Sequence, residues 1–183
     1  ESFWRADLDE AAGRLAGILA EESADVLVVY DDHGMYGHPD HIQVHRVGVR
    51  AAERAGTPKV YENTFDRDRM RELTALVLRD PERYGLAAGG DAGGAPAEMP
   101  DAPGQEDFGL PGELITTRVD VSGFLADKRA AMKAHASQIA DTSFFLSMSS
   151  ELFALTWGTE FYVLRGAPPG TAETDLFEGI GPA

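Results

Sequence analysis

Residues 26–30 read Val26-Leu27-Val28-Val29-Tyr30, and this short run is the clearest strand signal in the chain. The run is apolar and rich in β-branched residues, which is typical of a strand buried on both faces of a parallel sheet. The polar stretch 31–38 that follows holds two Asp, two Gly and two His, and it predicts a loop. A helix is expected from Pro39, which is tolerated in a first turn, to about Arg54, with Gly56 ending it.

The elements on both sides of this run alternate between helix and strand. Before the run, residues 7–21 carry apolar side chains at helical spacing, and Asp7 followed by Glu10 resembles a capping box. After it, we expect a second strand at residues 59–64 and another helix at 66–79. Such alternation is typical of parallel strands with helices packed on the sheet. We therefore expect an α/β fold with a Rossmann-like, mainly parallel sheet flanked by helices.

The second half of the chain repeats this pattern after an interruption. Residues 85–108 are mostly Gly, Ala and Pro, and they predict a flexible insertion. Beyond the insertion we expect strands at 115–121 and 160–164, and helices at 122–139 and 144–155. We expect one α/β domain over residues 1–166, followed by an irregular tail at 167–183.

Composition limits what the chain can do. The 183 residues include no cysteine and carry a formal net charge of −15. Disulfides and thiolate ligands are therefore excluded, and any metal must be held by His, Asp or Glu. The negative charge repels phosphate backbones and anionic lipids, so we expect no nucleic-acid or membrane partner. We expect a cytoplasmic protein, because disulfides are absent and no apolar run is long enough to span a membrane.

Three of the five histidines fall within residues 38–45. His41 and His45 are four residues apart on the expected helix, and His38 lies in the loop just before it. This cluster follows the end of a strand, where open α/β sheets bind their ligands. Neutral imidazole is a good zinc ligand, and Asp40 could bind the metal or hold a histidine ring. Histidines near a helix start are also often plain polar loop residues, so spacing alone leaves both interpretations open.

A longer stretch adds a resemblance. Residues 30–45 read Tyr-Asp-Asp-His-Gly-Met-Tyr-Gly-His-Pro-Asp-His-Ile-Gln-Val-His, and they resemble the second signature of the PIG-L/LmbE-like zinc-dependent N-deacetylases. The resemblance is closest to the bacterial branch that includes the mycothiol-pathway deacetylase and the mycothiol conjugate amidase. Ser2-Phe3-Trp4, the segment from Lys128 to Gln138 and residues 160–164 resemble the same branch. The resemblance thus extends over nearly the whole chain.

The resemblance implies a role for each of four residues. His41 would be a zinc ligand, and His38 would stabilise the oxyanion or protonate the leaving amine. Asp40 would hydrogen-bond His38 and tune its charge, while Tyr36 would lie on a mobile loop and help to polarise the substrate carbonyl. The implied reaction is hydrolysis of an N-acyl amide by water that the metal activates. The implied substrate is an N-acetylglucosamine-type amino sugar or a related thiol-conjugate amide, and the implied metal is zinc, with iron as an alternative.

One part of the family pattern does not occur in this chain. Family members carry an earlier Ala-His-Pro-Asp-Asp-Glu signature that supplies two metal ligands and the general base. Here His-Pro-Asp occurs once, at residues 38–40, and the chain begins without Met. We therefore expect the chain to be the C-terminal two-thirds of the family fold, without its N-terminal strands. By itself it should hold zinc weakly and turn over no substrate.

Other interpretations stay open. The chain could be a non-catalytic remnant or a sugar-binding module, or a second chain could supply the absent signature in an oligomer. Asp31 and Asp32 could bind substrate, but acids at a strand end more often form turns. His135 is more often a helix-terminal residue than a ligand, and the role of His45 is left open.

Overall fold

The computed structural model describes residues 2–84, 108–139 and 143–181. Two compact units make up the chain, and each combines segments that are distant in the sequence. Unit 1 consists of residues 1–67, 103–119 and 161–183, and unit 2 of residues 68–102 and 120–160. The chain passes repeatedly between the two units. The expected single domain over residues 1–166 stays a prediction.

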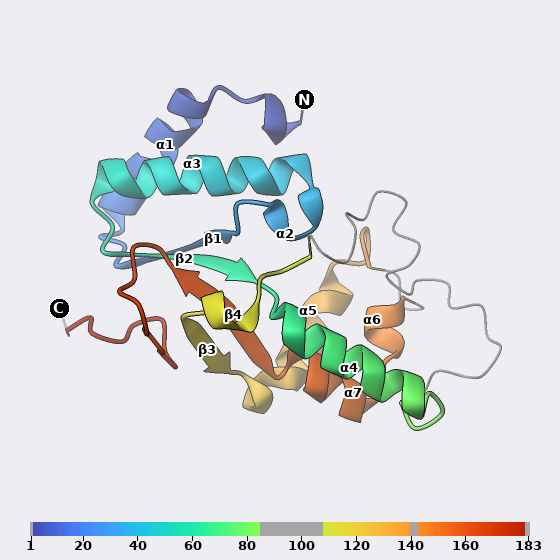
Figure 1. Cartoon of the computed structure of the whole chain (residues 1–183). Helices are drawn as coiled ribbons and strands as arrows, with labels where there is room; N and C mark the ends of the chain where they lie inside the picture. Colours follow the sequence, from blue (N-terminus) through green and yellow to red (C-terminus); the bar gives the residue numbers. More distant parts are fainter. Residues whose placement is uncertain (1, 85–107, 140–142, 182–183) are drawn as a thin grey trace. The chain divides into compact units, whose positions relative to one another are not determined.

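Unit 1 is built on a sheet of four strands in the order β1-β2-β4-β3. The strands are β1 (Val26–Tyr30), β2 (Lys59–Thr64), β3 (Thr117–Asp120) and β4 (Thr159–Leu164). β1 pairs with β2 in parallel, whereas β2 pairs with β4 in antiparallel orientation. The α/β class is confirmed, and the sheet is mixed rather than mainly parallel (Figure 1). An apolar pattern predicts a strand but not whether it runs parallel or antiparallel to its neighbour. That direction depends on how the connecting segments pack.

β1 is one of the two edge strands of the sheet in the described part of the chain. Val29 is 5% exposed and faces helix α3, whose Gly48 lies against it. Val28 points to the other side and is 44% exposed. The expectation that this strand is buried on both faces is therefore wrong for the residues described, because helices cover only one of its faces.

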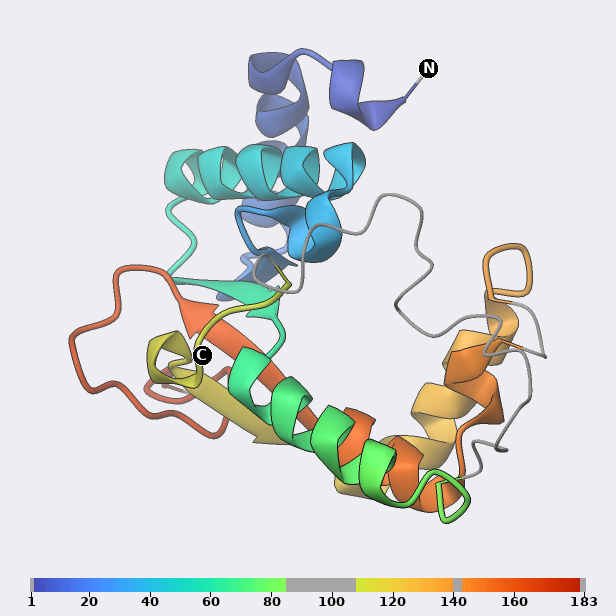
Figure 2. The ribbon, with the colours of Figure 1, turned by 45° about the vertical axis from the view of Figure 1, so that its right-hand side comes forward.

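Two helices of unit 1, α1 (Leu8–Glu21) and α3 (Pro39–Ala55), lie on the same side of β1 and β2 (Figures 1 and 2). The predicted cap is confirmed, since the Asp7 carboxylate accepts a hydrogen bond from the Glu10 N–H at 2.8 Å. Gly56 ends α3 in the left-handed region with φ +71°. The buried contact between the helices is made by Ala12, Leu19, Val47 and Ala51. Small alanine side chains at this contact let the two helices approach closely.

Unit 2 is helical in its described residues. Its helices are α4 (Arg67–Arg79), α5 (Leu125–Ala134), α6 (Phe144–Ser147) and α7 (Ser150–Trp157). The core consists of Tyr84, Met148, Leu152 and Phe153. The helix expected at 122–139 is shorter, because the chain leaves helical geometry at His135. The helix expected at 144–155 is divided, because Ser149 caps a new helix by accepting a hydrogen bond from the Leu152 N–H.

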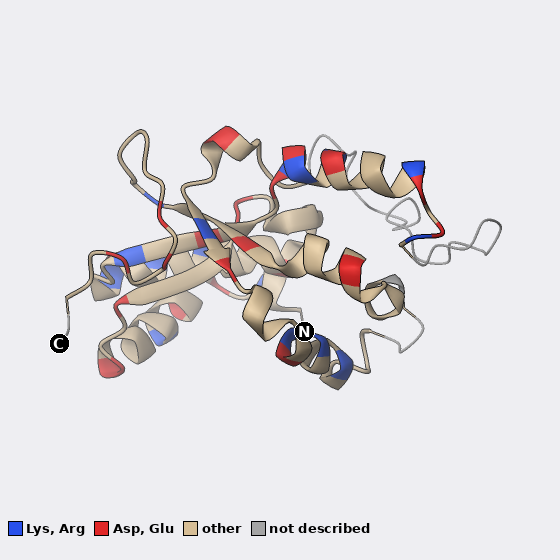
Figure 3. Ribbon diagram, turned by 90° about the horizontal axis from the view of Figure 1, so that it is seen from below, with Lys and Arg blue, Asp and Glu red and all other residues tan. Residues whose placement is uncertain are grey.

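The described residues also include three short 3-10 segments: η1 (Phe3–Arg5), η3 (Gly112–Leu114) and η4 (Ser122–Phe124). The insertion expected at 85–108 lies outside the described residues, apart from Phe108. None of the helices in the described ranges is long and apolar enough to cross a membrane. Acidic positions occur on helices and loops and are interspersed with basic ones (Figure 3).

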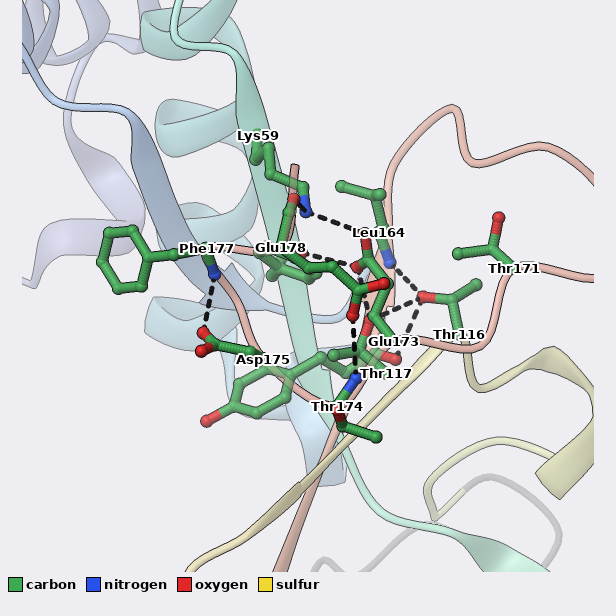
Figure 4. Close-up of polar contacts among 12 residues, drawn as sticks. Lys59, Thr116, Thr117, Leu164, Thr171, Glu173, Thr174, Asp175, Phe177 and Glu178 are labelled. Carbon is green, nitrogen blue, oxygen red and sulfur yellow. Dashed lines mark hydrogen bonds and ion pairs between the residues drawn. The ribbon is translucent and has the colours of Figure 1, made fainter. Parts of the chain in front are cut away.

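The tail after Gly166 forms no helix or strand within its described residues 167–181, but it is bound to the sheet. Glu173 forms an isolated bridge with Thr117, and its carboxylate accepts a hydrogen bond from Lys59 of β2 (Figure 4). It accepts another from Tyr61 of the same strand. The tail is therefore tied to unit 1 by a residue that no sequence pattern marked.

Candidate functional site

The loop after β1 is organised by the carboxylate of Asp31. This side chain is 1% exposed and accepts hydrogen bonds at 2.7 Å from the Met35 N–H and from the Thr64 hydroxyl of β2. Both carboxylate oxygens are thus engaged within the protein. Asp31 acts as a turn residue, whereas Asp32 is exposed and pairs with His33 at 2.5 Å.

The turn that Asp31 holds is strained. The short helical segment α2 (Gly34–Gly37) contains non-helical residues, and Met35 has φ +65° and ψ −60°. A positive φ is uncommon for a residue with a side chain, and such conformations cluster at functional sites. The hydrogen bond from Asp31 to the Met35 N–H helps to maintain this conformation. The strained turn carries Tyr36 into the histidine cluster.

His41 lies in the first turn of α3 and is surrounded by aromatic rings. Its ring stacks on Tyr30 with centroids 4.0 Å apart and planes 12° apart. The rings of Tyr36 and His38 lie 5.1 Å and 4.8 Å from it. The structure therefore brings three of the predicted site residues together and adds Tyr30 as a fourth ring.

The hydrogen bond of His41 identifies the nitrogen that is available to a ligand. His41 Nδ1 lies 3.3 Å from the carbonyl oxygen of Gly34. A carbonyl can only accept, so Nδ1 carries the proton and Nε2 keeps its lone pair. Burial lowers the pKa of His41 below its ordinary value, and the neighbouring His38 adds to this effect. Neutral imidazole with a free Nε2 is the form that binds zinc.

His38 caps the N-terminus of α3. Its Nδ1 accepts a hydrogen bond from the Asp40 N–H at 3.1 Å. In the neutral ring the proton must then be on Nε2, which is a hydrogen-bond donor. The side chain is exposed, so this donor is accessible from solvent.

The carboxylate of Asp40 contacts the N-terminal segment. Its Oδ1 accepts hydrogen bonds at 2.7 Å from the Ser2 hydroxyl and from the Trp4 N–H. These two donors hold the pKa of Asp40 below its ordinary value. Asp40 contacts His38 through its backbone N–H, and the expected hydrogen bond between its carboxylate and His38 stays a prediction. Sequence reasoning missed this use of Ser2 and Trp4, although both belong to the segment that resembles the family.

Tyr36 sits beside both histidines. Its ring contacts His41 edge-on at 5.1 Å and His38 at 6.1 Å. Burial raises the pKa of Tyr36, and the nearby Tyr30 raises it further. The phenol therefore stays protonated at neutral pH and can donate a hydrogen bond.

His45 is oriented toward the strand rather than toward the other histidines. Its Nδ1 donates to the carbonyl of Tyr30 at 3.0 Å and lies 3.7 Å from a carboxylate oxygen of Glu62. The side chain is mostly buried, with 13% exposed. His45 thus supports Tyr30, which is the residue on which His41 stacks.

The donor set of the described residues fits one side of a metal site. His41 Nε2 is a suitable zinc ligand, but no group of three or more His, Asp or Glu side chains that could hold a metal occurs within residues 2–84, 108–139 and 143–181. The described part of the chain therefore provides one imidazole nitrogen suited to a metal, with hydrogen-bond donors around it, and no complete coordination sphere.

Comparison with known proteins finds relatives that align with nearly the whole chain, although no family model matches it. The chain is 44% identical over 195 aligned residues to the 1D-myo-inositol 2-acetamido-2-deoxy-alpha-D-glucopyranoside deacetylase of Streptomyces avermitilis, covering 99% of the chain and 63% of that protein. Proteins of the same name from Streptomyces scabiei and Thermomonospora curvata are 41% and 37% identical, over 98% and 97% of the chain. The alignments cover 58% and 62% of those two proteins, so the chain spans about three-fifths of the length of these relatives.

Proposed function

The chain belongs to the PIG-L/LmbE-like deacetylase family, and from this premise we propose that it is part of a zinc-dependent N-deacetylase. The proposed reaction is hydrolysis of the amide of an N-acetylglucosamine-type amino sugar, which releases acetate and a free amine. The supporting observation is the His41 ring, whose Nδ1–H is bound to Gly34 while Nε2 is left with a lone pair. The relatives are named for deacetylation of a 2-acetamido-2-deoxyglucopyranoside joined to inositol.

The described residues suit this chemistry in separate roles. His41 would hold the metal through Nε2, and other ligands would come from outside the described residues. When bound, zinc polarises a carbonyl and lowers the pKa of water to about 7. The Nε2–H of His38 and the phenol of Tyr36 are donors that can face the oxygen on which charge develops. We propose that Asp40 orients the start of α3 by its bonds to Ser2 and Trp4.

The proposed partner is a small amino-sugar substrate, and the proposed location is the cytoplasm. The chain has no cysteine, which fits a reducing compartment. Iron in place of zinc would use the same imidazole ligand.

Substitution of the two histidines tests the proposal in the complete natural protein that contains this chain. We expect His41→Ala to lose zinc, because a ligand is removed. His38→Ala should retain one equivalent of zinc while kcat falls about 10²- to 10³-fold, the usual effect of removing an oxyanion donor. Metal content is measured by mass spectrometry of the purified protein, and kcat by the release of acetate.

His135→Ala is the matched control, because this histidine is exposed at the end of α5 in unit 2. It should leave both zinc content and rate unchanged. A full equivalent of zinc in His41→Ala would reject the assignment of that residue.

The alternative is a sugar-binding module without hydrolysis. It is favoured by one observation, namely that three metal-binding side chains do not converge anywhere in the described ranges. A complete protein that binds an N-acetylated amino sugar, contains no zinc and releases no acetate would support this alternative.

A further inference from the structure

Tyr30, the last residue of β1, provides a flat surface for the His41 ring. The two ring centroids are 4.0 Å apart, and the planes differ by 12°. The other ring contacts of His41, with Tyr36 and His38, are inclined by 74° and 40°. Among the described ring contacts of His41, the one with Tyr30 is therefore the one that sets the plane of the imidazole.

The backbone of Tyr30 is held in place from two sides. It pairs with Asn63 in the parallel register of β1 and β2, and its carbonyl accepts a hydrogen bond from His45 Nδ1 at 3.0 Å. His41 and His45 are one helical turn apart on the same face of α3. One of these histidines stacks on the ring of Tyr30, and the other binds its carbonyl. Tyr30 is thus fixed on both the strand and the helix.

Two contacts together determine where His41 Nε2 points. Stacking on Tyr30 sets the plane of the ring, and the bond from Nδ1 to the Gly34 carbonyl excludes the flipped orientation. Once the plane of the ring is fixed and its flipped orientation is excluded, the direction of Nε2 is fixed as well. A ligand whose direction is set before the metal arrives loses less freedom on binding.

We propose that Tyr30 is a positioning residue that orients the zinc-ligating nitrogen of His41. The inference rests on the proposed function, since it takes His41 as a metal ligand. The orientation of His41 depends on the flat face of the Tyr30 ring and not on the Tyr30 hydroxyl.

The test compares two substitutions of Tyr30 in the complete natural protein. Tyr30→Phe keeps the ring, and we expect its zinc affinity to stay within about twofold of the wild type. Tyr30→Leu removes the flat face, and we expect the Kd for Zn²⁺ to rise about 10- to 100-fold, as for other residues that orient a metal ligand. The Kd is measured by competition with a chromophoric chelator. Phe145→Leu, which removes an aromatic contact with Trp157 in unit 2, is the control and should leave the Kd for Zn²⁺ unchanged.

A second measurement does not depend on metal at all. The ¹⁵N shifts of the His41 ring in the metal-free protein report which nitrogen carries the proton. The wild type and Tyr30→Phe should show the proton on Nδ1, whereas Tyr30→Leu should show a mixture of both forms. Circular dichroism monitors the fold, and Tyr30→Val, whose β-branched side chain suits a strand, replaces Tyr30→Leu if the latter does not fold.

The outcomes separate this inference from the proposed function. If His41→Ala binds Zn²⁺ as tightly as the wild type, the proposed function fails. If His41→Ala loses Zn²⁺ but Tyr30→Leu binds it like the wild type, only the positioning role of Tyr30 is overturned. Equal losses in Tyr30→Phe and Tyr30→Leu would also overturn it, because the hydroxyl would then be the important group.

Discussion

Gly34 determines how closely the strained turn can approach α3. This residue is buried with φ +65°, and a Cβ atom there would lie 2.9 Å from the Cβ of His41 and 2.9 Å from the Ile42 nitrogen. Cβ atoms in proteins essentially never lie within 3.0 Å of another such atom, so the neighbouring backbone would have to shift. The Gly34 carbonyl is also the acceptor for His41 Nδ1. A single glycine thus permits both the turn and the orientation of the ring.

Gly34→Ala should therefore affect both stability and the site. We expect the free energy of unfolding to fall by about 1–3 kcal/mol, because the substitution adds backbone strain and a steric clash. Zinc affinity should fall with it, because the acceptor of His41 moves. Urea denaturation and chelator competition measure the two effects.

Gly56→Ala separates strain from the clash. Gly56 has a similar φ of +71°, but no atom lies within 4 Å of its added Cβ. It should lose less stability than Gly34→Ala and keep its zinc affinity. Equal zinc affinity in the two variants would contradict the role given to the Gly34 turn.

At the level of elements, the approach of α3 to β1 depends on another glycine. A Cβ on Gly48 would lie 2.3 Å from Cγ1 of Val29. The helix therefore lies directly against the strand, with a hydrogen atom where other residues carry a side chain. This close packing places the start of α3, and with it His41, next to Tyr30.

Comparison of two helix glycines tests this packing. Gly17→Ala in α1 has open space around the new Cβ, and we expect it to stabilise the protein by about 0.5–1 kcal/mol through helix propensity alone. Gly48→Ala has the same gain in propensity, but it should destabilise the protein by about 1–3 kcal/mol, since it overpacks the contact with Val29. Thermal unfolding followed by circular dichroism measures both. Similar stabilisation by both variants would show that α3 can move away from β1 at no cost.

At the scale of the whole molecule, Glu173 joins the tail to two strands of the sheet. Its carboxylate accepts hydrogen bonds from Lys59 Nζ at 2.8 Å and Thr117 Oγ1 at 3.1 Å (Figure 4). It accepts a third from Tyr61 Oη at 2.6 Å. Its backbone N–H also donates to the Thr116 carbonyl at 2.8 Å. The Glu173 side chain is 12% exposed, and Tyr61 is fully buried. The last part of the chain is therefore stabilised by a partly buried charge with three donors.

The pKa shifts at this cluster predict a dependence on pH. Burial alone would raise the pKa of Glu173, but the bonds from Lys59, Tyr61 and Thr117 outweigh it, and the pKa is lowered. Since the folded pKa lies below the unfolded one, the stabilising contribution is complete above about pH 4.3. It is lost as the pH falls through the folded pKa. Lys59, whose pKa is raised, loses its own contribution only in strongly basic solution, as the pH rises through its folded value.

Glu173→Gln should lower the free energy of unfolding at pH 7 by about 1–3 kcal/mol, because it leaves Lys59 without its charged partner. The loss of stability between neutral and acid pH should be smaller in this variant than in the wild type. Amide hydrogen exchange should become faster at the Glu173 N–H, which donates to the Thr116 carbonyl, and at the Arg118 N–H, which donates to the Glu173 carbonyl. Asp175→Asn, an exposed acid in the same tail, is the control. An identical pH profile in Glu173→Gln and the wild type would exclude this role.

Local signals in the sequence were sufficient for the elements that carry the site. The β-branched run 26–30, the Asp7 cap, Pro39 and Gly56 each act on neighbouring residues, so their effect is readable without the fold. The cluster of His38 and His41 was likewise visible from spacing, and the resemblance gave it a chemical meaning. Element ends in unit 2 were less predictable, because the serine at 149 interrupts an otherwise apolar helix.

The α/β class, the order of the elements and the position of the histidine cluster could thus be predicted from the sequence, because they depend on local propensity and periodicity. Three features became known only from the folded structure: the antiparallel direction of β4, the stacking of His41 on Tyr30 and the contact of Asp40 with Ser2. The Ser2 contact joins residues that are 38 positions apart, and the bond from Tyr61 to Glu173 joins residues 112 positions apart. Such contacts depend on how whole elements pack, and no local pattern of residues encodes that packing.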